Sequence, residues 1–189
     1  VLTYSVFKEF DAITRNVKVR NVGYEDVKIL RVLSANVDFN DDDFDMIQLS
    51  GSWARERHFV RQPLRSGSQS IESRRGSSSH AQNPFMALAR KDTTETKGDI
   101  YGFSFVYSGN FLANVEVDMF YNSRVQIGIN PFDFSWLLKE NEEFQSPEAV
   151  LVYSPNGVTG MSHIYHNLYG KRLARGEHRD KIRPILINN

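Results

Sequence analysis

Hydrophobic and polar residues alternate with a period of two through most of residues 1–155. Leu2, Tyr4 and Val6 open this pattern, and turn-forming residues such as those at 108–110 interrupt it every few residues. Successive side chains of a strand point to opposite faces, so this alternation indicates strands that are buried on one face. Short strands at such spacing are typical of antiparallel sandwiches and barrels. The pattern predicts a mainly β protein with an antiparallel β-sandwich.

At the N-terminal end the simplest interpretation of the pattern is one long antiparallel hairpin. The alternation runs to Arg20, the residues at 21–23 (Asn-Val-Gly) predict a turn, and 27–39 reads as the returning strand. Turn residues between two alternating runs are the usual signal of a hairpin. We therefore expect the two runs to pair with each other.

After Pro155 the period changes from two to between three and four. Apolar residues then recur on one helical face, basic residues follow in the last turns, and Gly176 provides a stop; the apolar positions are Met161, Ile164, Tyr165, Leu168, Tyr169 and Leu173. This predicts an amphipathic helix from about Gly160 to Arg175. We divide the chain into a β domain at 1–155, a linker helix region at 156–182 and the start of another domain at 183–189, where an apolar run predicts a buried strand.

The amino-acid composition excludes several kinds of partner and binding site. The 23 Lys and Arg balance the 23 Asp and Glu, so no overall field favours nucleic acid or an acidic membrane surface as a partner. The absence of cysteine excludes disulfides and thiolate metal sites, and favours a cytoplasmic protein. No apolar run approaches the ~20 residues of a membrane span. The chain begins with Val1 and stops within an apolar run, so both ends look cut from a longer protein.

Two clusters raise the question of metal binding. The acidic stretch contains Asp41, Asp42, Asp43 and Asp45 but lacks the glycine turn and distal glutamate of an EF-hand, so we expect a solvated turn without an ordered cation. His163 and His166 lie three apart on the predicted helix without a carboxylate at ligand spacing, and we expect both to be exposed. No phosphate loop, nucleophile elbow or zinc signature is present, so we assign no catalytic residue, cofactor or metal.

The candidate binding residues lie in a polar stretch between two strand-like runs, at 72–85. This stretch combines Gly76 and three serines with side chains rich in hydrogen-bond donors: Arg74, Arg75, His80, Gln82 and Asn83. Small residues allow close approach, and these side chains suit a polar, neutral partner such as a sugar or another subunit. The alternative is a solvated loop, and composition alone does not separate the two.

Aromatic residues supply a second set of candidates. Trp53 lies close to Arg57 in a charged stretch, and Phe132, Phe134 and Trp136 alternate with polar residues, so that they share one face of a predicted strand. Either set could stack on a sugar, but aromatic rings in a β protein are more often buried, and we favour the structural interpretation for both. An exposed tryptophan would favour a binding module.

Several blocks of the chain resemble bacterial α-galactosidases of glycoside hydrolase family 36. The blocks are Gly51–Arg57, Glu72–His80, Gln82–Phe85, Tyr101–Phe111, Ile129–Phe134 and Arg183–Asn189. The family combines an N-terminal β-supersandwich, a linker helix, a catalytic (β/α)₈ barrel and a small C-terminal β domain. The resemblance implies that this chain forms most of the supersandwich, the linker and the opening of the barrel.

The resemblance also implies a function. Family members are retaining hydrolases of terminal α-galactosides such as melibiose or raffinose, a reaction that needs two carboxyl groups about 5 Å apart. In the family both are aspartates of later barrel strands, and no residue here matches them. The resemblance thus implies a non-catalytic domain that supports a homotetramer and the rim of a neighbouring subunit's sugar site. A stand-alone carbohydrate-binding β-sandwich module is the alternative.

Overall fold

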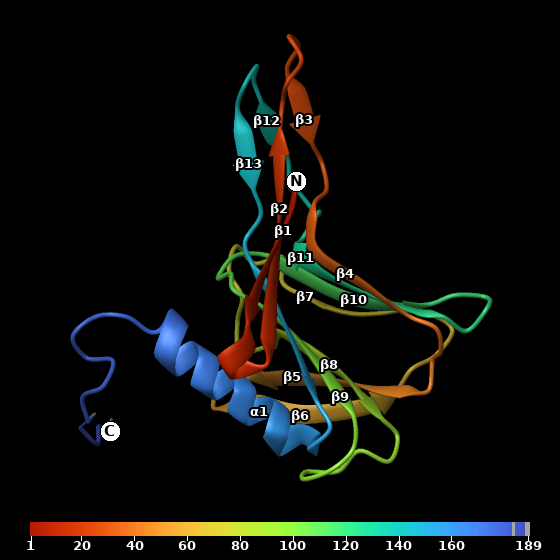
Figure 1. The fold of residues 1–189 in the computed structure, drawn as a ribbon, viewed down its shortest axis with the longest axis vertical. Coiled ribbons are helices and arrows are strands. Elements are labelled where there is room, and N and C mark those ends of the chain that lie inside the picture. Colours follow the sequence, from red (N-terminus) through yellow and green to blue (C-terminus); the bar gives the residue numbers. More distant parts are fainter. Residues whose placement is uncertain (183, 188–189) are drawn as a thin grey trace.

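The computed structural model describes residues 1–182 and 184–187, and its two main antiparallel sheets pack face to face (Figure 1). The larger, eight-stranded sheet has the order β1 (Leu2–Phe7), β2 (Ala12–Arg20), β14 (Ala149–Ser154), β9 (Ile100–Phe105), β8 (Gln82–Arg90), β5 (Phe44–Ser52) and β6 (Arg55–Pro63), with β13 (Glu143–Gln145) pairing with β2. The smaller sheet has the order β4 (Leu33–Phe39), β11 (Ser123–Ile129), β10 (Phe111–Val117) and β7 (Gly67–Glu72). The predicted antiparallel β-sandwich is confirmed.

The main core lies between the two sheets. Phe44, Met86 and Leu88 of the larger sheet meet Phe111 and Val115 of the smaller sheet, and all five are at most 1% exposed. Each strand contributes every second residue to this layer, because the side chains of a strand alternate between its faces. The period of two therefore identified the buried positions of these strands, whereas Leu2, Tyr4 and Val6 of β1 follow the same alternation but are 52%, 57% and 71% exposed, contrary to the prediction.

A second core joins the outer face of the larger sheet to the helix α1 (Gly157–Leu168). Met161 and Tyr165 pack over Gly102 of β9, where a Cβ atom would lie 2.8 Å from both side chains, so the helix rests directly on the strand backbone. The buried Tyr165 hydroxyl donates a hydrogen bond to the carbonyl of Val150 at 3.1 Å. Burial raises the pKa of the Tyr165 hydroxyl well above its usual value, so this donor persists at neutral pH.

The helix is confirmed, with shifted ends. It begins at Gly157, three residues before the predicted start, and after Leu168 it widens into a π-helical turn at Tyr169–Leu173. Gly157 has φ +65°, and a Cβ atom there would lie 2.3 Å from the carbonyl oxygen of Thr94. Contact with the β8–β9 loop thus sets the start of the helix, and apolar periodicity does not report such a contact.

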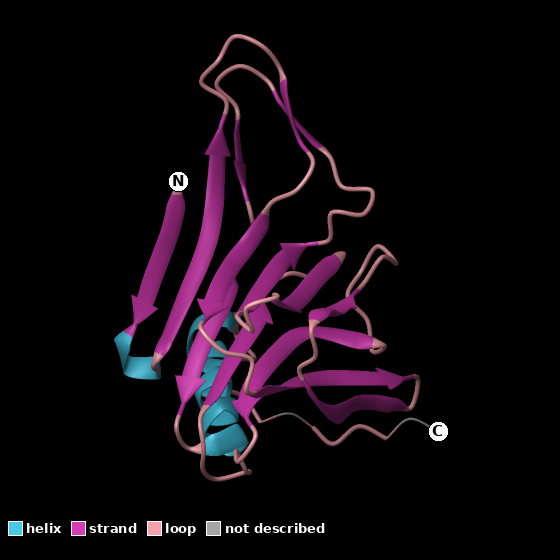
Figure 2. Cartoon of the chain, turned by 90° about the vertical axis from the view of Figure 1, so that its right-hand side faces the viewer, coloured by secondary structure: helices cyan, strands magenta, loops and turns pink. Residues whose placement is uncertain are grey.

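The predicted N-terminal hairpin is wrong. Strand β2 pairs with β1, β13 and β14, whereas the expected returning strand divides into β3 (Val27–Ile29) and β4. Strand β3 pairs with β12 (Trp136–Leu138) in a projection that rises above the sandwich, and β4 pairs with β11 in the smaller sheet (Figure 1, Figure 2). The alternation identified strands correctly, but β2 turns back onto the preceding strand β1, and the partners of β3 and β4 are more than 80 residues away in sequence, where a local pattern carries no information.

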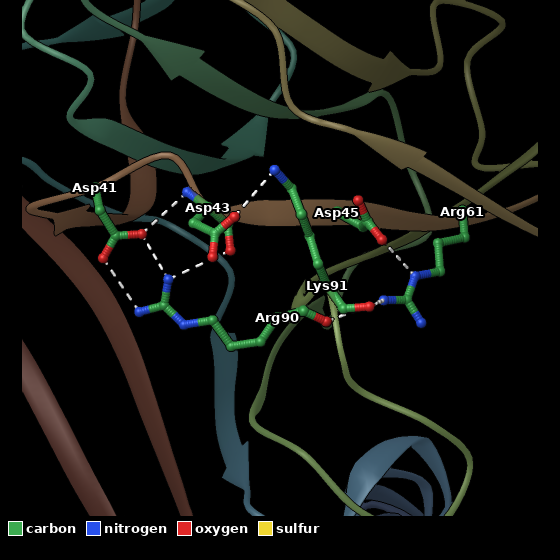
Figure 3. A network of polar contacts seen from close by, with 6 residues as sticks. All are labelled: Asp41, Asp43, Asp45, Arg61, Arg90 and Lys91. Atoms are coloured by element: carbon green, nitrogen blue, oxygen red, sulfur yellow. Dashed lines mark hydrogen bonds and ion pairs between the residues drawn. The ribbon is translucent and has the colours of Figure 1, made fainter.

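The acidic turn is solvated at Asp41 and Asp43, whose side chains are 46% and 65% exposed, but its ion pairs were not predicted. Three of its carboxylates form ion pairs with basic residues of β6, β8 and the following loop (Figure 3). The pairs are Asp41 with Arg90 at 2.5 Å, Asp43 with Lys91 at 3.0 Å, and Asp45 with Arg61 at 2.7 Å. The pairing of β5 with β6 and β8 brings these opposite charges together, so the acidic stretch contributes ion pairs to the fold.

We expect Asp41→Asn to lower the free energy of unfolding by roughly 1 kcal/mol at pH 7, a modest value because the Asp41 side chain is 46% exposed. The hydrogen bond from the Arg90 guanidinium lowers the pKa of the Asp41 carboxyl below its usual value. Because the pKa of the Asp41 carboxyl is lower in the folded state, its ion pair stabilises the fold at pH values above the unfolded-state pKa of about 3.9. This stabilisation is lost as the pH falls through the folded-state pKa.

Urea unfolding of both proteins at pH 7 and near pH 3 checks this expectation. The difference between them should shrink at the acid pH, and Asp42→Asn, at a neighbouring residue outside these ion pairs, should change little at either pH. An equal difference at both pH values would contradict the electrostatic explanation.

The last described residues depart from the expected buried strand. Residues 184–187 form no strand in the structure, and the side chains of Ile185, Leu186 and Ile187 are at least 88% exposed. Arg183, Asn188 and Asn189, which belong to the same prediction, lie outside the described residues. Within the described part of the chain no helix is both long and apolar enough to cross a membrane.

Candidate functional site

The loop between β7 and β8 has a fixed backbone. Asn130, which is 2% exposed, donates hydrogen bonds to a carboxylate oxygen of Glu72 at 2.9 Å and to the carbonyls of Ser73 and Phe111 at 3.2 Å each. The amide of Gly76, at φ +86°, donates to the side chain of Asn110 at 2.7 Å. A loop held by this many contacts presents its side chains in defined directions.

The two adjacent arginines of this loop behave differently. Arg74 turns back onto its own domain, where it forms an ion pair with Glu72 at 2.8 Å and lies 4.4 Å above the centre of the Phe132 ring. Arg75 is exposed and has no side-chain partner among residues 1–182 and 184–187. Gln82 also has a structural role, since its side-chain oxygen accepts the amide of Glu72 at 2.7 Å. The loop therefore leaves Arg75 available for an external partner.

Two of the predicted site residues of this stretch, His80 and Asn83, meet Arg57 of the neighbouring hairpin. Together with Glu56 these three residues line a pocket of about 330 Å³. The hairpin reaches the loop because β5 pairs with β8, and the amide of Gly51 donates to the carbonyl of Ala81 at 3.1 Å. The sequence did not indicate Glu56 as a site residue, because only the pairing of β5 with β8 shows which residues of the hairpin face the loop.

Trp53 lies at the tip of the β5–β6 hairpin and is 84% exposed, so the expectation of a buried ring is wrong. It occupies the turn between Ser52 and Arg55 together with Ala54, whose φ is +60°. A side chain at the tip of a two-residue turn has few neighbours to pack against, whatever its hydrophobicity. The ring is thus available at the surface, three residues before the pocket residue Glu56.

The expected aromatic face of Phe132, Phe134 and Trp136 does not exist as one surface. The residues before Trp136 form a turn, in which Asp133 has φ +55°, so the strand alternation is broken. Phe132 lies beneath Arg74, whereas Phe134 and Trp136 pack against Phe144 with ring centres 6.0 and 5.3 Å apart. These rings are mostly structural, although Trp136 remains 48% exposed.

The helix histidines and the carboxylates do not assemble a metal site in the described part of the chain. His163 and His166 are both exposed on α1, as their spacing predicted. Among residues 1–182 and 184–187 no group of three or more His, Asp or Glu side chains is placed to hold a metal ion. The chemistry of the site is therefore that of its polar side chains.

The pocket is suited to hydrogen bonding. It combines donors on Arg57 and His80 with acceptors on Asn83 and Glu56. Glu56 is the one carboxylate among its described lining residues, whereas a retaining glycosidase uses two. The arrangement can bind and orient a polar molecule, and it contains no acid and nucleophile pair.

Comparison with known proteins identifies similar sequences over the whole chain. Residues 1–139 match the model of the glycosyl hydrolase family 36 N-terminal domain, and residues 143–189 match the melibiase model. The chain is 57% identical to alpha-galactosidase AgaA of Geobacillus stearothermophilus and 44% identical to alpha-galactosidase Mel36A of Lactobacillus acidophilus. Each match covers 100% of this chain and 26% of the relative, so the chain spans about a quarter of the length of these relatives.

Solved structures agree with the sequence matches. The structure of GH36 AgaA from Geobacillus stearothermophilus superposes with a TM-score of 0.97 at 57% identity, over 100% of this chain and 26% of that one. The alpha-galactosidase of Lactobacillus brevis superposes with a TM-score of 0.96 at 46% identity, over 100% of this chain and 25% of that one. Variants of AgaA have been crystallised in complex with stachyose and with raffinose.

Proposed function

The chain belongs to glycosyl hydrolase family 36, and from this premise we propose that it is the non-catalytic N-terminal β-sandwich region of an α-galactosidase. The observation that carries the proposal is the match of the entire chain, at 57% identity, to about a quarter of AgaA. A domain with this sequence and fold serves an enzyme whose catalytic carboxylates lie in the rest of the protein. Because the chain contains no cysteine, the proposal also places the enzyme in the cytoplasm.

The reaction proposed for the whole protein is hydrolysis of terminal α-galactosides with retention of configuration. One carboxylate attacks the sugar while a second carboxyl group protonates the leaving oxygen, and the two lie about 5 Å apart. Substrates of the melibiose and raffinose type are supported by the raffinose and stachyose complexes of AgaA. The part played by this chain is support of the catalytic domain and of the assembly.

Within that assembly the β7–β8 loop contacts a neighbouring subunit of a homotetramer, at the rim of its sugar site. Arg75 and His80 are exposed on a loop whose backbone is already held by Asn130 and Asn110. Little conformational entropy remains to be lost when such a loop binds, and arginine is enriched at protein interfaces. These properties suit a preorganised contact with carboxylates or carbonyls of a partner.

The alternative, a stand-alone carbohydrate-binding module, is favoured by one observation. Trp53 is 84% exposed and Trp136 is 48% exposed, and sugars stack on exposed aromatic rings. Hydrolysis of an α-galactoside by the intact protein separates the two functions, because a module without a catalytic domain shows no turnover. Burial of Trp53 in the assembly, measured by quenching of its fluorescence, would further favour the interface.

Arg74 and Arg75 provide a matched test of the loop. In the 189-residue chain Arg74→Ala should lower the free energy of unfolding by about 1 kcal/mol, because it loses a partly exposed ion pair and a cation–π contact. Arg75→Ala should change it by less than about 0.5 kcal/mol. In the full-length enzyme Arg75→Ala should weaken subunit association by roughly 2–5 kcal/mol, as measured by analytical ultracentrifugation, and galactoside turnover should fall with it.

Arg65→Ala serves as the control, since Arg65 is an exposed arginine at the other end of β7. It should leave stability, association and turnover unchanged. Normal assembly and turnover of the full-length Arg75→Ala enzyme would show that the loop is solvated surface.

A further inference from the structure

The pocket between the hairpin tip and the β7–β8 loop contains hydrogen-bonding groups that the fold does not use. The side-chain oxygen of Asn83 is buried and accepts no hydrogen bond from the described residues. Arg57 and His80 have no side-chain partner within residues 1–182 and 184–187, and Glu56 accepts one bond, from the amide of Ala54 at 3.1 Å. Buried acceptors are almost always satisfied in native proteins, so this one points to a ligand or an ordered water.

The backbone around the pocket is irregular in several places at once. The ladder between β5 and β6 shifts register between Ser50 and Ser52, and the ladder between β5 and β8 shifts between Gln48 and Ser50. Arg57 has φ +58°, in the left-handed region that disfavours a large side chain. Bulges and strained residues concentrate at functional sites, where they direct a side chain that a regular strand would point elsewhere.

A third irregularity is the close approach of the two hairpin strands at Gly51. A Cβ atom on this residue would lie 2.3 Å from the carbonyl oxygen of Arg55, so the local geometry requires glycine. Gly51 also donates its amide to Ala81, next to the pocket residue His80. The same glycine thus shapes the hairpin and joins it to the loop that completes the pocket.

Charge and hydrogen-bonding capacity define the class of ligand. The positive charge of Arg57 is matched by the negative charge of Glu56, so this pair of side chains favours neither a phosphate nor a cation. A hydroxyl group both donates and accepts, and it can satisfy the oxygen of Asn83 while it accepts from Arg57 or His80. A neutral ligand with several adjacent hydroxyls therefore fits this set of side chains better than an ion does.

The pocket continues into a larger, more apolar space. Arg57 and Asn83 also line a groove of about 480 Å³ between the larger sheet and α1, whose walls include Phe59, Phe85 and Tyr165. Phe59 is 49% exposed, so part of its ring is open to contact. Sugar rings have an apolar face that packs on aromatic side chains, and the groove gives room for a second ring beside the pocket.

We propose that this pocket binds one hexose unit of a neutral oligosaccharide, with the adjacent unit lying along Phe59 and Phe85. The sugar hydroxyls donate to Asn83 and accept from Arg57 and His80. The pocket is inferred from its own side chains, whereas the choice of galactosides as first probes rests on the proposed α-galactosidase function.

The test is a titration of the isotopically labelled 189-residue chain with raffinose, stachyose and the non-galactoside maltotriose, followed by NMR. We expect saturable chemical shift changes at Arg57, His80 and Asn83 with at least one of the three sugars. His80→Ala should weaken the affinity about tenfold, the effect of one lost hydrogen bond to the ligand. His163→Ala, at an exposed histidine of α1 that lines neither the pocket nor the groove, is the matched control and should bind as the parent does.

Asn83→Ala tests the buried acceptor, and His80→Ala keeps the test valid if the asparagine variant fails to fold. Binding of maltotriose alone would support the pocket and remove the support it lends to a galactoside enzyme, so the two proposals fail separately. The pocket proposal is overturned if none of the sugars shifts the pocket resonances, or if His80→Ala binds as tightly as the parent. It is also overturned if the same resonances shift only with protein concentration, since the pocket is then an interface between chains.

Discussion

Replacing Phe44 by alanine should lower the free energy of unfolding by about 3–5 kcal/mol, the usual cost of removing a fully buried phenylalanine. Phe44 is 0% exposed and lies between the two sheets, with ring centres 5.1 Å from Phe39 and 6.0 Å from Tyr101. The guanidinium of Arg90 lies 3.9 Å above the centre of its ring. The substitution therefore leaves a cavity at the point where the core meets the ion-pair network of Figure 3.

Urea unfolding followed by circular dichroism measures this loss, and Phe120→Ala is its control. Phe120 is 75% exposed at the turn between β10 and β11, so its removal should change the free energy of unfolding by less than about 0.5 kcal/mol. Similar values for the two variants would contradict the core assigned here. Because Phe44 opens β5, the strand that leads to the candidate pocket, Phe44→Ala should also weaken sugar binding.

Replacing Asn130 by alanine should lower the free energy of unfolding by about 2–4 kcal/mol and loosen the β7–β8 loop. The two hydrogens of the side-chain amide are shared among three acceptors, one of them the carboxylate of Glu72, and the side-chain oxygen accepts the amide of Phe132 at 3.0 Å. Bonds to charged groups contribute more than bonds between neutral groups, and the buried site leaves the former partners without replacements. The amide of Phe132 should then exchange with solvent faster.

Asn130→Asp sharpens this prediction. It keeps the shape and an acceptor for Phe132 but places a second carboxylate beside Glu72, so it should destabilise at least as much as alanine. Asn167→Ala is the control, because Asn167 is exposed on α1. Unchanged stability of Asn130→Ala, together with unchanged exchange at Phe132, would show that the loop is held by its other contacts.

The sequence by itself determined the class of fold and the position of the helix. A period of two followed by a period of 3.6 is a property of neighbouring residues, and burial of one face is sufficient to impose it. The same locality explains the wrong predictions. Strand pairs such as β3 with β12 form between segments that are 100 residues or more apart. The alternation within Val27–Ile29 therefore contains no information that its partner is Trp136–Leu138.

For the candidate site, too, the sequence predicted the residue types involved, whereas only the tertiary structure shows their contacts. The polar stretch at 72–85 was recognised from its donors, but the sequence did not separate Arg74, which pairs with Glu72, from Arg75, whose side chain has no partner in the described part of the chain. The pairing of β5 with both β6 and β8 brings Arg57 beside His80 and Asn83, and the turn geometry exposes Trp53. Residue types determine which interactions are available, and tertiary structure decides which of them are formed, because each partner is supplied by a distant segment of the chain.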